Sequence, residues 1–84
     1  MSSTCRFCHE WRGEMIHYST RHYAHLKCAL AKKGLRFLRD DISHPGLRWR
    51  YESYSVNQIV DWLPEKDRTV AGVLAVRELL GRPV

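Results

Sequence analysis

The sequence predicts a small α+β domain, in which two strands near the N-terminus precede several helices. Three observations indicate this class: the chain is short, its first third contains two strand-like segments, and apolar residues recur at helical spacing further along. A chain of 84 residues forms one domain and buries only about 60–65% of the surface that it exposes when unfolded. Such a domain usually needs disulfides, a bound metal ion or a partner chain to be stable.

The first predicted element is a β-hairpin over residues 14–24. Residues 14–18 and 21–24 are short strand-like runs with apolar and aromatic side chains, and Ser19 and Thr20 lie between them. Two such runs joined by a short polar link are typical of a hairpin, although this link contains no strong turn residue.

Residues 26–39 have the period of an amphipathic helix. Its apolar side consists of Leu26, Leu30, Gly34, Phe37 and Leu38. Its basic side consists of Lys32, Lys33, Arg36 and Arg39. We favour one continuous helix, because the apolar side continues past Gly34 and packing can offset the cost of an internal glycine, about 1 kcal/mol. In the alternative, Gly34 ends the helix at Lys33, with Leu35 folded back onto Leu30.

A turn-rich stretch at residues 40–46 marks a subdomain boundary. After it, Leu47, Trp49 and Tyr51 alternate with charged residues, which predicts a short strand. Ser55 and Gln58 then form a capping box that begins a helix.

The two predicted C-terminal helices have clear apolar sides. The first ends at or before Pro64 and is expected to bury Val56, Ile59, Val60 and Leu63. The second has the acids Glu65 and Asp67 at its start and ends near Gly81 and Pro83. Its expected buried residues are Val70, Val73, Leu74, Val76, Leu79 and Leu80.

The cysteines and one histidine have the spacing of a metal site. Cys5 and Cys8 form a C-x2-C pair, and His25 and Cys28 form an H-x2-C pair at the start of the predicted helix. Two such pairs can supply the four corners of a tetrahedral Zn²⁺ site, and the helix N-terminus favours a thiolate at Cys28. His22 is a rival to His25, but the x2 spacing favours His25. A redox role for Cys5 and Cys8 is disfavoured because a matching H-x2-C pair is present.

This arrangement resembles a treble-clef zinc finger and is similar in spacing to the first zinc site of LIM domains. The resemblance covers the first third to half of the chain, and a LIM domain would need a second four-ligand site, for which no cysteines remain. Residues 16–25 are also similar to small uncharacterised zinc proteins of bacteria and phages, which implies no function. The resemblance implies a treble-clef zinc-binding module in residues 1–40, with residues 41–84 as a helical extension packed on it within one compact domain.

Positive charge is concentrated in the first half of the chain. Residues 1–39 contain eight Lys and Arg against two acids, whereas residues 40–84 contain six against seven. The sequence therefore suggests a nucleic-acid partner, DNA or RNA, although the same charge also serves solubility. The expected contact residues are Arg21, Lys27, Lys32, Lys33, Arg36 and Arg39. Trp11, Tyr18, Tyr23 and Trp49 could stack on unpaired bases, but Trp49 and Tyr51 are more readily interpreted as core.

The alternative is a protein-interaction module, an adaptor or an inhibitor of a partner protein, that docks or self-associates through its C-terminal helices. No phosphate-binding glycine loop, nucleophile elbow or paired-carboxylate motif is recognisable, and four protein ligands leave zinc no open position. We therefore expect a structural zinc site and no enzymatic activity. No signal peptide and no apolar run of about 20 residues is recognisable, so we expect a cytoplasmic protein that does not enter membranes.

Overall fold

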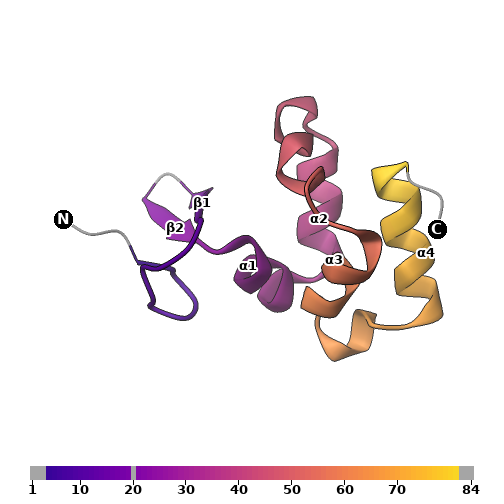
Figure 1. Ribbon diagram of the computed structural model, residues 1–84, viewed down its shortest axis with the longest axis horizontal. Coiled ribbons are helices and arrows are strands. Elements are labelled where there is room, and N and C mark those ends of the chain that lie inside the picture. The colour runs from indigo at the N-terminus through magenta and orange to yellow at the C-terminus, as the bar shows by residue number, and fades with distance from the viewer. Residues whose placement is uncertain (1–3, 20, 82–84) are drawn as a thin grey trace.

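The computed structural model describes residues 4–19 and 21–81 (Figure 1). The molecule is elongated, with principal extents of 41 × 27 × 19 Å. The hairpin lies at one end, helix α1 (Leu26–Lys33) lies in the middle, and the later helices form the other end (Figure 1). The α+β class predicted from the sequence is confirmed.

The predicted hairpin is present. Strands β1 (Ile16–Ser19) and β2 (His22–Ala24) pair antiparallel, with Ile16 opposite Ala24 and an irregular register toward Ser19. The predicted turn includes Thr20, which lies outside the described residues.

One face of the hairpin packs toward the helices. Ile16 and Tyr18 are half-buried, whereas their neighbours along β1 are exposed, as expected for alternating strand side chains. The ring of Tyr18 stacks on that of Phe37, with centroids 6.0 Å apart and planes 19° apart. The hairpin is therefore joined to the helical part by aromatic packing.

The continuous helix favoured for residues 26–39 is wrong, and the alternative end at Lys33 is correct. Helix α1 ends at Lys33 and helix α2 (Leu35–Ile42) begins immediately after Gly34. Gly34 has a φ of +70°, a conformation that most residues avoid. The predicted apolar side is still buried on both sides of the break, since Leu30 in α1 and Leu38 in α2 are fully buried.

A contact from a distant segment explains the break. The Asp67 carboxylate accepts a hydrogen bond of 3.3 Å from the backbone N–H of Leu35, which satisfies one donor at the start of α2. Gly34 leaves room for this carboxylate, because a Cβ atom there would lie 2.5 Å from Asp67 Oδ2. Nothing in residues 26–39 indicates this contact, so the sequence pattern alone favours the wrong interpretation.

The strand predicted around residues 47–51 is also wrong, because residues Pro45–Tyr51 form a 3₁₀ helix, η1. The side chains of Arg50 and Tyr51 both reach the same carboxylate oxygen of Asp41, at 3.0 Å and 2.6 Å. Adjacent residues of a strand point to opposite faces and could not do this. Tyr51 is core, as interpreted from the sequence, but Trp49 is 63% exposed.

The C-terminal helices agree largely with the prediction. Helix α3 (Val56–Trp62) begins with the predicted capping box of Ser55 and Gln58. A short 3₁₀ helix, η2 (Glu65–Asp67), separates it from α4 (Val70–Leu80), which Thr69 caps and which ends at Gly81. The prediction that Glu65 and Asp67 lie at the start of the last helix is wrong, because α4 begins only after the cap at Thr69. Pro83 lies outside the described residues.

The hydrophobic core joins the helices, and two predicted core residues lie outside it. The fully or almost fully buried side chains of this cluster are Leu26, Leu30, Leu38, Tyr51, Ile59, Val60, Leu63, Val76 and Leu80. Val70 and Leu74, expected to be buried, are 78% and 53% exposed. The core is complete without them, because Val76 and Leu80 already occupy the buried side of α4. The boundary near residue 40 stays a prediction.

We expect Gly72→Ala to destabilise the protein, although alanine is normally better than glycine in a helix by about 1 kcal/mol. A Cβ atom at position 72 would overlap the backbone carbonyl oxygen of Asp67, which cannot rotate away. The expected loss is about 1–3 kcal/mol, measured by urea unfolding. Gly46→Ala is the matched control, since no atom lies within 4 Å of the added Cβ. Equal stability of the two variants would contradict this close approach.

Candidate metal centre

Three local structures bring the predicted metal ligands together. Residues after Cys5 form a tight turn, closed by a hydrogen bond of 2.9 Å from His9 N–H to the Cys5 carbonyl, so that Cys8 returns toward Cys5. His25 immediately precedes α1, and Cys28 lies in the first turn of that helix. The backbone N–H of Arg6 donates to the Tyr23 carbonyl at 2.8 Å, which holds the turn against the hairpin.

The four side chains form a compact donor group. One ligand atom from each of Cys5, Cys8, His25 and Cys28 lies within 4.8 Å of all the others, and together they could hold a metal ion. Cys5 and His25 are buried, Cys28 is half-buried and Cys8 is exposed. Among residues 4–19 and 21–81, no other group of three or more His, Cys, Asp or Glu residues is placed to hold a metal ion.

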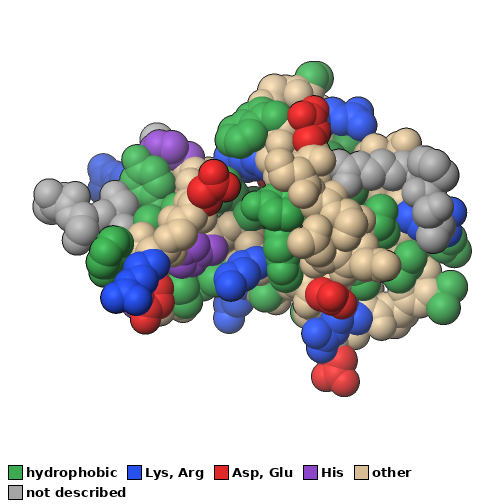
Figure 2. All heavy atoms as spheres, in the orientation of Figure 1, with side chains coloured by type: hydrophobic (Ala, Val, Ile, Leu, Met, Phe, Trp, Pro, Cys, Tyr) green, Lys and Arg blue, Asp and Glu red, His purple; other side chains and the backbone are tan. Residues whose placement is uncertain are grey.

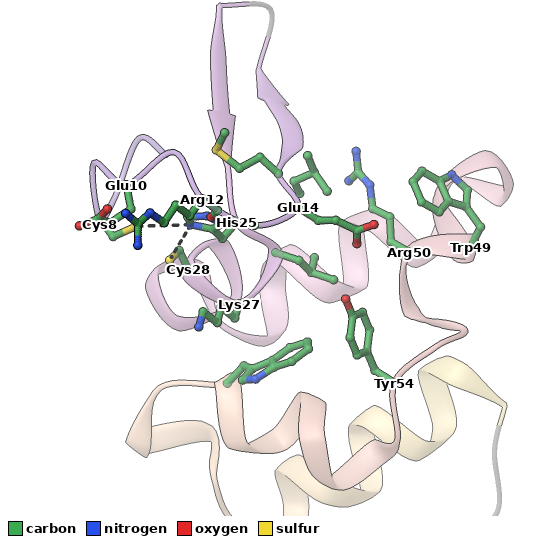
Figure 3. Close-up of a pocket in the computed structure, with 15 residues that line it drawn as sticks. Cys8, Glu10, Arg12, Glu14, His25, Lys27, Cys28, Trp49, Arg50 and Tyr54 are labelled. Atoms are coloured by element: carbon green, nitrogen blue, oxygen red, sulfur yellow. Dashed lines mark hydrogen bonds between the residues drawn. The ribbon is translucent and has the colours of Figure 1, made fainter. Parts of the chain in front are cut away.

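The orientation of the His25 ring suits a metal ligand. Its Nδ1 atom faces the sulfurs, 3.3 Å from Cys8 Sγ and 3.7 Å from Cys28 Sγ (Figure 3). Its Nε2 atom lies 2.5 Å from the backbone carbonyl oxygen of Arg12. A carbonyl only accepts hydrogen bonds, so Nε2 carries the proton in a neutral ring and Nδ1 keeps a lone pair for a cation. His22, the rival from the sequence, is exposed on β2 and lies outside the group.

The Arg12 carbonyl is a site component that the sequence analysis missed. Every residue has a backbone carbonyl oxygen, so the residue type at position 12 cannot predict this contact. The nearest sequence signal is Gly13. That glycine has a φ of +88° and follows Arg12 directly, so the chain can turn beside the His25 ring. A glycine between two predicted ligand pairs is too common to identify such a contact in advance.

The thiols of the group differ in acidity. Burial opposes ionisation of Cys5, but backbone N–H groups of Cys8, His25 and Phe7 donate to its sulfur and lower its pKa to about 6. Burial, together with hydrogen bonds to and charge on Cys5 and Cys8, raises the pKa of Cys28 to about 12. We expected the helix N-terminus to favour a thiolate at Cys28, but burial and the neighbouring cysteines outweigh that effect. A bound divalent cation would instead favour the thiolate form of Cys28, because it attracts all three thiolates at once.

The residues expected to contact nucleic acid lie on the surface. All six, Arg21, Lys27, Lys32, Lys33, Arg36 and Arg39, are exposed. Lys27 lines a groove beside the donor group. Lys33 instead lies beside the hairpin, with its ammonium 6.0 Å from the centre of the Tyr18 ring. Lys27 and Lys33 therefore have different surroundings.

Comparison with protein-family models, curated proteins and solved structures finds no match to this chain. Its class therefore follows from its own geometry: it is a small α+β protein with a Cys₃His group that could hold a metal ion. Within the described part of the chain, no helix has the length and apolar character needed to cross a membrane.

Proposed function

We propose that Cys5, Cys8, His25 and Cys28 bind one structural Zn²⁺ ion that organises the hairpin end of the protein. The convergence of three sulfurs and one imidazole nitrogen within 4.8 Å supports this proposal most strongly. Tetrahedral zinc with bonds of about 2.0–2.3 Å places its ligand atoms roughly 3.3–3.8 Å apart. The separations of His25 Nδ1 from Cys8 Sγ and Cys28 Sγ, 3.3 Å and 3.7 Å, lie in that range, whereas the whole group spans up to 4.8 Å.

The order of elements supports a treble-clef arrangement for the proposed site. A turn supplies Cys5 and Cys8, the hairpin follows, and the start of α1 supplies His25 and Cys28. With four protein ligands the ion would keep no water molecule, so we propose a structural role and no hydrolytic one.

We further propose that the protein binds nucleic acid, DNA or RNA, through exposed basic residues. Within the described residues, the ion pair Arg50–Asp41 forms, and none of the six expected contact residues takes part in an ion pair. These six cations can therefore bind phosphates. A zinc ion and three thiolates would change the formal charge of +5 to +4, so the positive balance remains.

Charge reversal tests this second proposal. We expect Lys32→Glu/Arg36→Glu to weaken binding of a short DNA or RNA probe roughly tenfold or more at about 50 mM salt. The slope of log affinity against log salt should also become shallower by about 0.7–0.9 for each phosphate that the variant no longer neutralises. Fluorescence anisotropy between about 50 and 200 mM salt measures both quantities.

Lys66→Glu/Arg68→Glu is the matched control, because both residues are exposed and the change in net charge is the same. This control should weaken binding far less. Equal weakening in the two variants would mean that net charge alone attracts the probe and that no particular surface binds it.

A protein partner remains the second candidate function, and one observation favours it. Val70 and Leu74 are one helical turn apart on α4 and are 78% and 53% exposed. Figure 2 shows hydrophobic surface over this end of the molecule. If the zinc-loaded protein binds no nucleic acid even at low salt, the basic residues serve solubility, and α4 becomes the surface to test for a partner or a second copy.

A further inference from the structure

A groove lies directly beside the proposed zinc site. It has a volume of about 910 Å³ and separates the N-terminal turn and α1 from η1 and α3. Cys8, Arg12 and His25 lie on one side of it, and Trp49 and Tyr54 lie on the other (Figure 3). A ligand in this groove would contact both ends of the molecule.

Aromatic rings line the helical side of this groove. Trp49, Tyr54 and Trp62 all contribute to the lining. Tyr54 and Trp62 contact each other edge to face, with centroids 4.7 Å apart, and are half-buried. Trp49 is 63% exposed. A ring that projects in this way offers a large flat surface on which another planar group can stack.

The residues that follow Trp49 anchor the backbone that carries it. Tyr51 is fully buried, and the Arg50 side chain is 10% exposed and paired with Asp41 at 3.0 Å. Because η1 is anchored through these two residues, the indole is held out toward the groove rather than left on a loose loop. The backbone at Trp49 would therefore lose little conformational entropy when a ligand stacks on the indole.

The charges in the groove limit what can lie there. The negative charges of Glu10 and Glu14 offset the positive charges of Arg12 and Lys27 in the lining. The charge of Arg50 is already neutralised by Asp41. With the zinc ion and its three thiolates counted as −1, the lining is slightly negative, although the whole chain carries a formal charge of +5. A polyanion can therefore lie here only with its charges at the exposed side chains of Arg12 and Lys27 and with its neutral, planar parts inside the groove.

We propose that this groove binds single-stranded nucleic acid, with an unpaired base stacked on Trp49 and adjacent phosphates near Arg12 and Lys27. The inference rests on the proposed nucleic-acid binding and specifies its form. Duplexes do not fit it, because their bases are already stacked on one another, whereas the bases of a single strand can turn outward onto aromatic side chains. Stacking tolerates any base, so we infer little sequence preference.

The test uses the zinc-loaded full chain and fluorescein-labelled oligo-dT, oligo-U and a hairpin duplex. The single strands should bind more tightly than the duplex. Trp49→Ala should weaken single-strand binding roughly 5- to 100-fold, the effect expected when one base can no longer stack. Trp49→Phe should retain part of the affinity. Because Trp49 is largely exposed, thermal melting of both variants should match that of the unmodified protein.

Leu74→Ala is the matched control, because Leu74 is a large exposed hydrophobic residue (53%) that does not line the groove. Its single-strand affinity should not change. Equal weakening by Leu74→Ala and Trp49→Ala, or tight binding of a poly-glutamate peptide that lacks bases, would overturn the groove assignment. Binding that depends on Lys32 and Arg36 but not on Trp49 would overturn it as well and leave nucleic-acid binding intact. Absence of binding to every probe would overturn both proposals.

Discussion

Cys8→Ser or Cys28→Ser should abolish zinc binding and leave the hairpin end without fixed structure. Structural zinc contributes apparent binding energies on the order of 10 kcal/mol or more in finger peptides, which equals the whole stability of many small domains. Cys8 and Cys28 supply their sulfurs from the N-terminal turn and from α1, respectively. The loss of either one would remove the proposed bond between these segments.

The expected unfolding is uneven along the chain. The hydrophobic cluster runs from Leu26 to Leu80 and includes no residue of the N-terminal turn among its buried members. Beyond the donor group, the hairpin end is connected to the helices chiefly by the rings of Tyr18 and Phe37 and the half-buried Ile16. We therefore expect chelation to disorder the hairpin first, and the helices to keep part of their structure.

Three measurements check this prediction. Elemental analysis should give one zinc per chain for the unmodified protein and none for Cys8→Ser, and cobalt substitution should give the visible bands of a tetrahedral thiolate site. Amide NMR spectra should lose the dispersed signals of the hairpin. His22→Ala is the control and should keep its zinc, since His22 is outside the donor group. A dispersed hairpin spectrum in metal-free Cys8→Ser would refute a structural role for the ion.

The parts of the fold that were predictable depend on short-range patterns. The ligand pairs Cys5/Cys8 and His25/Cys28 converge as their spacing suggests, and the capping box of Ser55 forms because both of its hydrogen bonds join residues three positions apart. Each ligand pair and the capping box are recognised within a few residues of sequence, although the two pairs meet across 17 residues, from Cys8 to His25.

Two of the wrong secondary-structure predictions involve contacts with residues outside the predicted element. Gly34 breaks the first helix where the carboxylate of Asp67 packs against it. The 3₁₀ helix η1 replaces a strand because its end is bound to Asp41 of the preceding helix. The spacing of apolar residues predicts which side chains are buried. It does not predict which hydrogen bonds the polar side chains will form.

Asp41→Ala should be the most damaging substitution outside the donor group. The Asp41 carboxylate accepts hydrogen bonds from Arg50 Nη1 at 3.0 Å and from the Tyr51 hydroxyl at 2.6 Å. Burial, and then the hydrogen bond to Asp41 and its charge, raise the pKa of Tyr51, so this phenol remains a neutral donor. Removal of the carboxylate would leave the Arg50 guanidinium buried without its counter-charge. The expected cost is about 3–5 kcal/mol, a large part of the stability of a small domain.

Asp40→Ala is the control for this prediction, because Asp40 is the exposed neighbour on α2 and uses its backbone carbonyl, not its carboxylate, to accept from Ser43 and His44. Urea unfolding should show a change below about 0.5 kcal/mol for this variant. The double variant Asp41→Ala/Arg50→Met should recover much of the stability, since it removes the buried Arg50 guanidinium together with the carboxylate that pairs with it. If it recovers nothing, the cost arises from poorer packing of η1 and not from the uncompensated guanidinium.

The same pair of variants connects stability to binding. Asp41 anchors η1 through Arg50 and Tyr51, and Trp49 projects from that helix toward the groove. Asp41→Ala should therefore weaken single-strand binding even in the fraction of molecules that remains folded, whereas Asp40→Ala should not. An Asp41→Ala protein that is destabilised but binds oligo-dT with undiminished affinity would show that the indole needs no rigid support, and that stacking at this groove depends on exposure alone.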